Sequence, residues 1–259
     1  MRDQLEDAHQ HRDDGYGRAQ HRTNTDLPKR LYKGVAVAPV AGGFTVTLDG
    51  RVVKTPGKKI AVVVPVADIA TTMAAEWSAQ GGHVDPAGMP MVRLINSALE
   101  SGEAMVPAFR DEVLKFAGND ALLYRAEGPQ ALVDDQEAIW DQALVALARH
   151  FGVRFQPTIG IIHQPQPAAT LARLGDGLQE QGLLAMTAMV SITGLTGSGL
   201  LAIGLLHGLF TRDHVWTAAH VDEDHQIGFW GQDEEAAARR AVRRREFDTA
   251  ADVLECLRN

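Results

Sequence analysis

The hydrophobic residues of this chain change their spacing once, near residue 66. Between residues 32 and 64 apolar side chains alternate with polar ones, and Asp49-Gly50 lies between two such runs. Alternation is typical of half-buried strands, and Asp-Gly is a strong signal for a two-residue hairpin turn. From Val66 onward apolar residues recur at three- and four-residue steps, which indicates helices. The sequence therefore predicts a small antiparallel β unit followed by helices.

Glycine and proline residues divide the rest of the chain into segments with helical spacing. We expect helices at residues 90–101, 107–117, 134–151, 167–180, 183–194, 198–211, 213–227 and 233–257. Strands followed by a run of helices argue for an α+β fold rather than an alternating parallel sheet. The expected organisation is a flexible polar arm over residues 1–28, an N-terminal β domain with one helix over 29–88, and a C-terminal all-helical domain over 89–259.

The charge balance excludes several classes of partner and compartment. Lys and Arg number 25 and Asp and Glu number 33, so the net charge of −8 offers no cationic field for nucleic acid. The single cysteine, Cys256, cannot form an internal disulfide, which fits a reducing compartment. The first 30 residues are rich in acidic as well as basic side chains, unlike a secretory signal or a transit peptide. We therefore expect a bacterial cytoplasmic protein rather than one of the mitochondrial matrix.

The segment Gln181–Thr211 is 31 residues long and carries no formal charge if His207 is neutral. Its length would admit a membrane span, and attachment through residues 183–210 is one possible interpretation. Glycines at 194, 197 and 199 instead divide the segment into two short apolar pieces, the length of buried core helices. We therefore expect no stable membrane insertion, and we expect Ser198 to cap the second helix.

Motifs for cofactor, metal or nucleophilic chemistry are weak or missing in the sequence. The glycines at 194, 197 and 199 reverse the dinucleotide-binding spacing, and no phosphate-binding loop is present. His214, His220 and His225 lie near acidic residues, but their separations of six and five residues do not repeat on one helical face. We therefore expect no cofactor, no metal site and no catalytic residue.

Glu223 is the carboxylate with the most unusual predicted surroundings. If residues 213–230 form one helix, five residues share a single stripe: Trp216, Ala219, Glu223, Gln226 and Trp230. A charge among apolar partners is costly to bury unless it is paired. Spacing alone leaves two explanations open, an internal salt bridge to an arginine of the last helix or a recognition site for a cationic group of another protein.

A competing interpretation is a small-molecule enzyme. Such an enzyme would use Glu223 or Glu76 as a general acid or base in a cleft between the two domains. For Glu223 the sequence assigns no convincing catalytic partner. For Glu76-Trp77, a half-buried tryptophan beside a solvated acid is the simpler explanation.

Several separate segments carry distinctive combinations of residues. They are Lys29-Arg-Leu-Tyr-Lys33, Leu48-Asp-Gly-Arg-Val-Val-Lys-Thr-Pro56, Ala75-Glu-Trp-Ser-Ala-Gln80, Pro86 with Met89-Pro-Met91, Asn119-Asp-Ala-Leu-Leu-Tyr-Arg125, Gln136 with Trp140-Asp141, and Asp222-Glu-Asp-His-Gln226-Ile-Gly-Phe-Trp230-Gly231. In this order and spacing they resemble the ATP synthase assembly chaperones known as assembly factor twelve. The resemblance covers about residues 29–258.

The resemblance implies an N-terminal β domain, a C-terminal helical domain and a function that is not catalytic. Chaperones of this family occur in mitochondria and alphaproteobacteria, where they bind the unassembled alpha subunit until the beta subunit takes its place. The resemblance also implies that Glu223 matches a functionally important glutamate, with Asp222, Gln226 and Trp230 as further partner-binding residues. The sequence departs from the family pattern at Asp222, where a glutamate is frequent, and at His225, where an aromatic residue is usual.

Overall fold

The computed structural model describes residues 27–258. Near the start of this part, the chain forms an antiparallel sheet of three strands. The strands β1 (Val35–Val40), β2 (Gly43–Leu48) and β3 (Arg51–Val52) lie side by side in sequence order. Asp49 and Gly50 connect β2 to β3 with φ angles of 48° and 77°. Both residues are therefore left-handed, as a two-residue hairpin turn requires, and the predicted hairpin is confirmed. The polar arm predicted at residues 1–28 lies outside the described residues except for its last two.

The apolar run from Ile60 to Val64 extends the sheet through isolated bridges rather than a full strand. Phe44 and Val64 exchange two backbone hydrogen bonds, of 2.8 and 2.9 Å. Gly43 makes this approach possible, because a Cβ atom there would lie 2.1 Å from the carbonyl oxygen of Val64. Glycine at this position is therefore a packing requirement.

Helix α2 (Ala67–Ser78) packs against β1 and β2 and then connects to the next helix through Glu76. The two carboxylate oxygens of Glu76 accept hydrogen bonds, each of 2.8 Å, from the backbone N–H groups of Met91 and Val92. These groups lie in the first turn of α3 (Pro90–Ser101), where N–H groups have no partner within the helix. Burial raises the pKa of Glu76, while the two backbone donors lower it.

The remaining elements are helices, short helical turns and two short strands, β4 and β5, which pair in parallel. They are η2 (Pro86–Gly88), η3 (Glu103–Met105), α4 (Val106–Gly118), η4 (Ala121–Leu123), β4 (Tyr124–Arg125), α5 (Gln130–Gln136), the π-helical turn η5 (Glu137–Asp141), α6 (Gln142–Phe151), β5 (Thr158–Ile159), α7 (Ala168–Asp176), α8 (Leu183–Thr196), α9 (Gly199–Leu206), α10 (Arg212–Ala219), α11 (Val221–Trp230) and α12 (Glu234–Arg258). The predicted fold class, α+β with a small N-terminal sheet and a larger helical part, is confirmed. The predicted domain boundary at residue 88 falls in η2 and stays a prediction.

The two apolar pieces of Gln181–Thr211 form α8 and α9, and both are largely buried. Helix α8 packs against α3, α4, α9 and α12, so protein surrounds it on several sides. Gly197 ends α8 in the left-handed conformation, with φ 70°, and the Ser198 side chain accepts a hydrogen bond from the N–H of Leu201. The predicted core helices and the predicted cap are confirmed. No helix among the described residues combines the length and the apolar character needed to cross a membrane.

Asp120 joins the end of α4 to the start of α9. Its fully buried carboxylate accepts hydrogen bonds from the Ser198 hydroxyl (2.8 Å) and from the N–H groups of Leu200 (2.9 Å) and Leu122 (3.2 Å). Burial raises its pKa to about 6, against the opposing effect of these donors. The carboxylate therefore accepts hydrogen bonds from N–H groups at the starts of two helices, η4 and α9.

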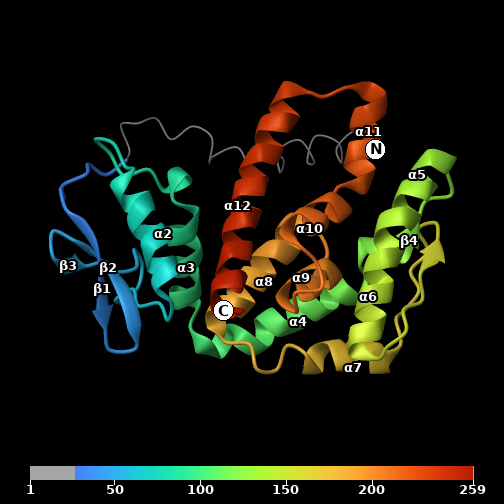
Figure 1. Cartoon of the computed structure of the whole chain (residues 1–259), viewed down its shortest axis with the longest axis horizontal. Coiled ribbons are helices and arrows are strands. Elements are labelled where there is room, and N and C mark those ends of the chain that lie inside the picture. The colour runs from blue at the N-terminus through green and yellow to red at the C-terminus, as the bar shows by residue number, and fades with distance from the viewer. Residues whose placement is uncertain (1–26, 259) are drawn as a thin grey trace, which may run out of the picture.

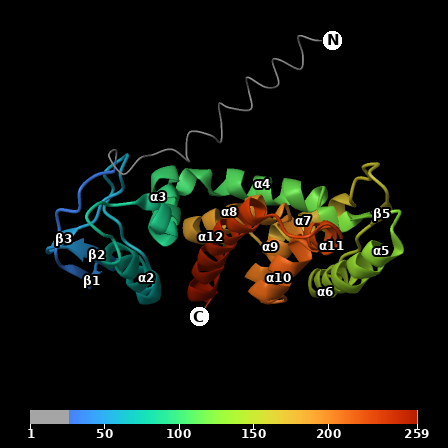
Figure 2. The same cartoon turned by 90° about the horizontal axis from the view of Figure 1, so that it is seen from above.

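The elements form an elongated arrangement (Figures 1 and 2). The sheet and α2 lie at one end, and α5 and α6 lie at the other. Helix α4 runs along the edge between these ends in Figure 2. Helices α11 and α12 form a hairpin that rises from the body beside α5 in Figure 1. The tip of the hairpin and α5 thus lie at the periphery of the helical part.

We expect Glu76→Ala to lower the free energy of unfolding by about 1–3 kcal/mol, because two backbone N–H groups at the start of α3 lose their acceptors. Glu76→Gln retains one acceptor oxygen and is expected to lose less. Urea denaturation followed by circular dichroism measures both variants. Equal losses for the two variants would argue against the capping role.

Asp120 also predicts a pH dependence of stability. The folded chain binds the proton of this carboxyl more tightly than the unfolded chain, whose pKa is near 3.8. Relative to an Asp120→Asn variant, the wild-type free energy of unfolding should therefore fall as the pH rises from 4 to 7, by on the order of 3 kcal/mol. Denaturation of both proteins across this range measures the difference, and a pH-independent difference would contradict the prediction.

Candidate functional site

Helices α10 and α11 meet at His220, where the single helix expected over residues 213–227 is interrupted. The backbone N–H of His220 donates to the carbonyl of Thr217 instead of continuing the α-helical pattern. The ring Nδ1 of His220 lies 2.7 Å from the carbonyl oxygen of Trp216, which the backbone would otherwise bond. The expectation of one unbroken helix is therefore wrong, because a side chain replaces a backbone donor.

The interruption also separates the residues of the predicted stripe. Trp216 is buried against Phe247 of α12, whereas the Trp230 side chain is 88% exposed at the end of α11. A shared apolar stripe from Trp216 to Trp230 is therefore wrong. Within α11, however, Glu223, Gln226 and Trp230 still share one side.

Helix α11 is held against α12 by ion pairs. Glu223 accepts from the Arg243 guanidinium at 3.1 Å, and Asp224 pairs with Arg240, one turn earlier in α12. The internal salt bridge proposed for Glu223 is therefore present. The Glu223 side chain nevertheless remains 36% exposed, so the pair is accessible to a partner.

Three of the four predicted partner-binding residues lie together. Glu223, Gln226 and Trp230 line a cavity of about 250 Å³ between α11 and the start of α12. Gln226 and Trp230 are exposed. This side of α11 thus presents a carboxylate, an amide and an indole to solvent.

Asp222, the fourth predicted residue, lies on another side of α11. Its carboxylate accepts a hydrogen bond of 2.8 Å from the side-chain amide of Gln136, the last residue of α5. The carbonyl oxygen of the Gln136 side chain in turn accepts from the N–H of Ala126 at 2.8 Å. Asp222 therefore connects the hairpin to α5 and is not brought together with the other three residues.

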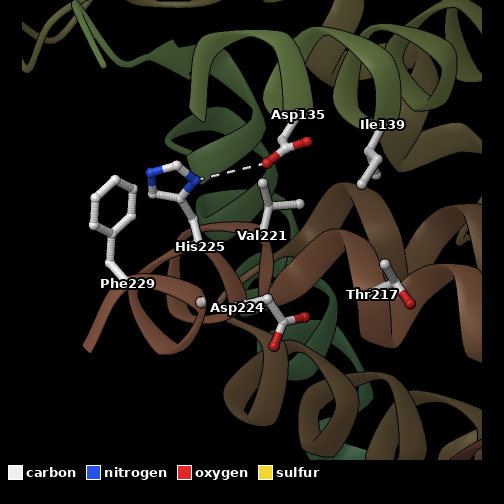
Figure 3. Close-up of a pocket in the computed structure, with 8 residues that line it drawn as sticks. Asp135, Ile139, Thr217, Val221, Asp224, His225 and Phe229 are labelled. Carbon is white, nitrogen blue, oxygen red and sulfur yellow. Dashed lines mark ion pairs between the residues drawn. The ribbon is translucent and has the colours of Figure 1, made fainter. Parts of the chain in front are cut away.

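A second concavity, which we call the α5–α11 groove, lies between α5 and α11 (Figure 3). The α11 residues that line it lie on the opposite side of the helix from Glu223, Gln226 and Trp230. Its volume is about 440 Å³. Eight residues line it: Asp135 and Ile139 from α5 and η5, Thr217 from α10, and Val221, Asp224, His225, Gly228 and Phe229 from α11. Sequence reasoning missed this groove, since it did not place α5 opposite α11.

The adjacent aromatics Phe229 and Trp230 were a signal that could have been used. Neighbouring residues of a helix point about 100° apart, so two large aromatic side chains in sequence cannot share a narrow buried face. Both are exposed, Phe229 by 71% and Trp230 by 88%. One faces the groove and the other faces the cavity beside Glu223.

The histidines of this region are dispersed rather than gathered. His214 lies near Phe210, His220 stacks on Trp216 with ring centroids 4.0 Å apart, and His225 lies near Phe229. Burial lowers the pKa of His220, which favours its neutral form. His220 Nε2 lies 3.8 Å from a carboxylate oxygen of Glu223, and because the ring is mostly neutral the two groups do not form a strong ion pair. Within residues 27–258 no group of three or more potential ligands is arranged to hold a metal ion.

Both carboxylates proposed for an enzyme already have partners within the described part of the chain. Both oxygens of Glu76 are occupied by backbone donors at the start of α3. Glu223 lies between α11 and α12, far along the chain from the sheet. The geometry of these residues is that of helix capping and ion pairing.

The chain is similar to proteins of one known family in sequence and in structure. Residues 29–148 match the family model described as ATP12 chaperone protein. The crystal structure of ATP12 from Paracoccus denitrificans is similar, with 30% identity and a TM-score of 0.81, over 88% of this chain and 98% of that one. A point mutant of the same Paracoccus protein matches at 29% identity with a TM-score of 0.80, over 88% of this chain and 97% of the mutant.

A second organism provides a further match. A protein from Agrobacterium tumefaciens proposed as a chaperone is 39% identical, with a TM-score of 0.85, over 94% of this chain and 91% of that one. The similarity to solved structures thus extends over more of the chain than the family model does. It includes most of the helical part as well as the sheet.

Proposed function

Because this chain belongs to the ATP12 chaperone family, we propose that it assists assembly of the ATP synthase by binding the unassembled alpha subunit. It holds this subunit and prevents its aggregation until the beta subunit takes its place. The bacterial origin of the relatives and the composition of the chain support a cytoplasmic site of action in a bacterium.

The observation that carries this proposal is the exposed aromatic pair at the end of α11. A folded domain rarely leaves adjacent large aromatic side chains in water, and Phe229 and Trp230 are 71% and 88% exposed. Aromatic side chains contribute disproportionately to protein–protein binding. An unassembled subunit exposes an apolar interface of its own, and the hairpin offers a surface of matching chemistry.

Holding a subunit requires a surface and no reaction. Anything that binds one state of the subunit raises the population of that state by mass action. Release follows when the beta subunit offers a larger interface for the same surface. No nucleotide hydrolysis by the chaperone is required, and a nucleotide-driven release by the purified chaperone alone would contradict this account.

Glu223 is proposed to contact the client directly, although it also pairs with Arg243. An exposed ion pair of this kind contributes little to stability, commonly less than about 1 kcal/mol. Its carboxylate lies beside Gln226 and Trp230 in the same cavity. A cationic group of the client can therefore share or replace Arg243 as its partner.

We expect Glu223→Lys to raise the Kd for isolated alpha subunit by about tenfold or more, because an attractive charge becomes repulsive at the contact. Arg243→Gln breaks the same internal pair but keeps the carboxylate, and it should bind within about twofold of wild type. The double variant Glu223→Lys with Arg243→Glu restores an internal pair in reverse and should still bind weakly. Light-scattering aggregation assays and a binding titration measure these effects, with thermal melting to confirm folding.

The opposite pattern would assign Glu223 a purely internal role. In that case Arg243→Gln would lose as much binding as Glu223→Lys, and the reversed pair would recover it. A large fall in melting temperature for Glu223→Lys, reversed by the double variant, would support the same conclusion. Failure of the wild-type chain to bind the alpha subunit would overturn the proposed function itself.

A further inference from the structure

The α5–α11 groove combines an apolar floor with acidic edges. Figure 3 shows Ile139 of η5 and Val221 of α11 facing one another across it, with Asp135 above and Asp224 below. The exposed ring of Phe229 lies at one end, beside the ring of His225. The lining therefore offers contact area for an apolar side chain and acceptors for a positive charge.

Both walls of the groove are acidic in sequence as well. Residues 127–141, which include α5 and η5, contain five carboxylates and no lysine or arginine. Helix α11 contains Asp222, Glu223 and Asp224 and also lacks lysine and arginine. On the α12 side Arg240 and Arg243 pair with two of these acids. Among residues 27–258, no arginine or lysine lines the groove itself.

Asp135 is the acid at the groove with the weakest internal pairing. Its side chain is 59% exposed, and its one ion-pair contact among the described residues is His225, 3.7 Å away. Asp224, by contrast, already pairs with Arg240. Asp135 is thus placed to accept a charge from outside.

Gly228 gives the groove its depth. It lies in the middle of α11, where glycine weakens a helix, and a Cβ atom built there would meet nothing within 4 Å. Internal packing therefore does not require glycine at this position. The missing side chain leaves open the space that an incoming side chain would fill.

We propose that the α5–α11 groove docks a segment of the client protein in which an apolar side chain is followed closely by a lysine or arginine. The apolar side chain packs between Ile139, Val221 and Phe229, and the cation reaches Asp135. This inference rests on the proposed function and adds a second contact, on the side of α11 opposite Glu223. The client would then hold α11 on two sides.

Filling the groove tests its apolar part. Gly228→Phe places a ring in the open space and should raise the Kd for isolated alpha subunit by about tenfold or more. Gly194→Phe is the matched control, because Gly194 is an exposed helical glycine of α8 that also has no neighbour within 4 Å of a built Cβ. The control should bind within about twofold of wild type, and neither variant should melt at a lower temperature, since each replaces a helical glycine.

Reversing the charge tests the cationic part. Asp135→Lys should raise the Kd for the alpha subunit by about tenfold at low salt. Glu112→Lys makes the same change in charge on α4, which lies at the bottom of Figure 1 while α11 lies at the top, and should leave the Kd within about twofold.

The outcomes separate the groove from the function. If wild type binds the subunit and Gly228→Phe and Asp135→Lys bind equally well, the groove proposal is wrong and the proposed function stands. If only Gly228→Phe weakens binding of the alpha subunit, the occupant of the groove carries no cation at Asp135 and that part of the proposal is wrong. If wild type does not bind, the proposed function is wrong and the groove proposal falls with it.

Discussion

Helix α8 has to be covered over most of its circumference, and this need organises the centre of the helical part. Its 14 residues contain no charged side chain, and apolar groups extend around its whole circumference. Helices α3, α4, α9 and α12 pack against it. Since α12 is 25 residues long, only its C-terminal half is needed for this burial, and its N-terminal half extends beyond the core.

Helix α11 packs beside this extension of α12 and therefore also lies outside the core for most of its length. The buried residues of α12 all lie between Phe247 and Leu254, whereas Glu234 to Arg245 include none. Ion pairs replace apolar contacts along the extension, with Glu223 and Asp224 of α11 facing Arg243 and Arg240. Buried Val221 and the hydrogen bond from Gln136 to Asp222 anchor the first turn of α11, whereas the ion pairs add little stability and leave its last turn without buried apolar residues. Phe229 and Trp230 therefore stay available at its end.

The sequence allowed prediction of those features that depend on local chemistry. Asp49-Gly50 predicts its hairpin because both residues tolerate the left-handed conformation, and Ser198 predicts its cap because its hydroxyl can accept from the following turn. The interruption at His220 was missed, because it depends on a side chain that bonds the carbonyl of Trp216. The groove was missed for a similar reason, since it needs α5 and α11 to meet, and residues about 90 positions apart carry no periodic signal of that contact.

The distribution of charge opposes self-association through the exposed aromatic surface. Two adjacent aromatic side chains in water would promote self-association. The chain carries a net charge of −8, so two copies repel each other at long range, although α12 places arginines next to the acids of α11. The same carboxylates attract a client that carries basic residues near its apolar interface. In the proposed function these acids therefore favour a cationic client over a copy of this chain, although the aromatic side chains alone would accept either.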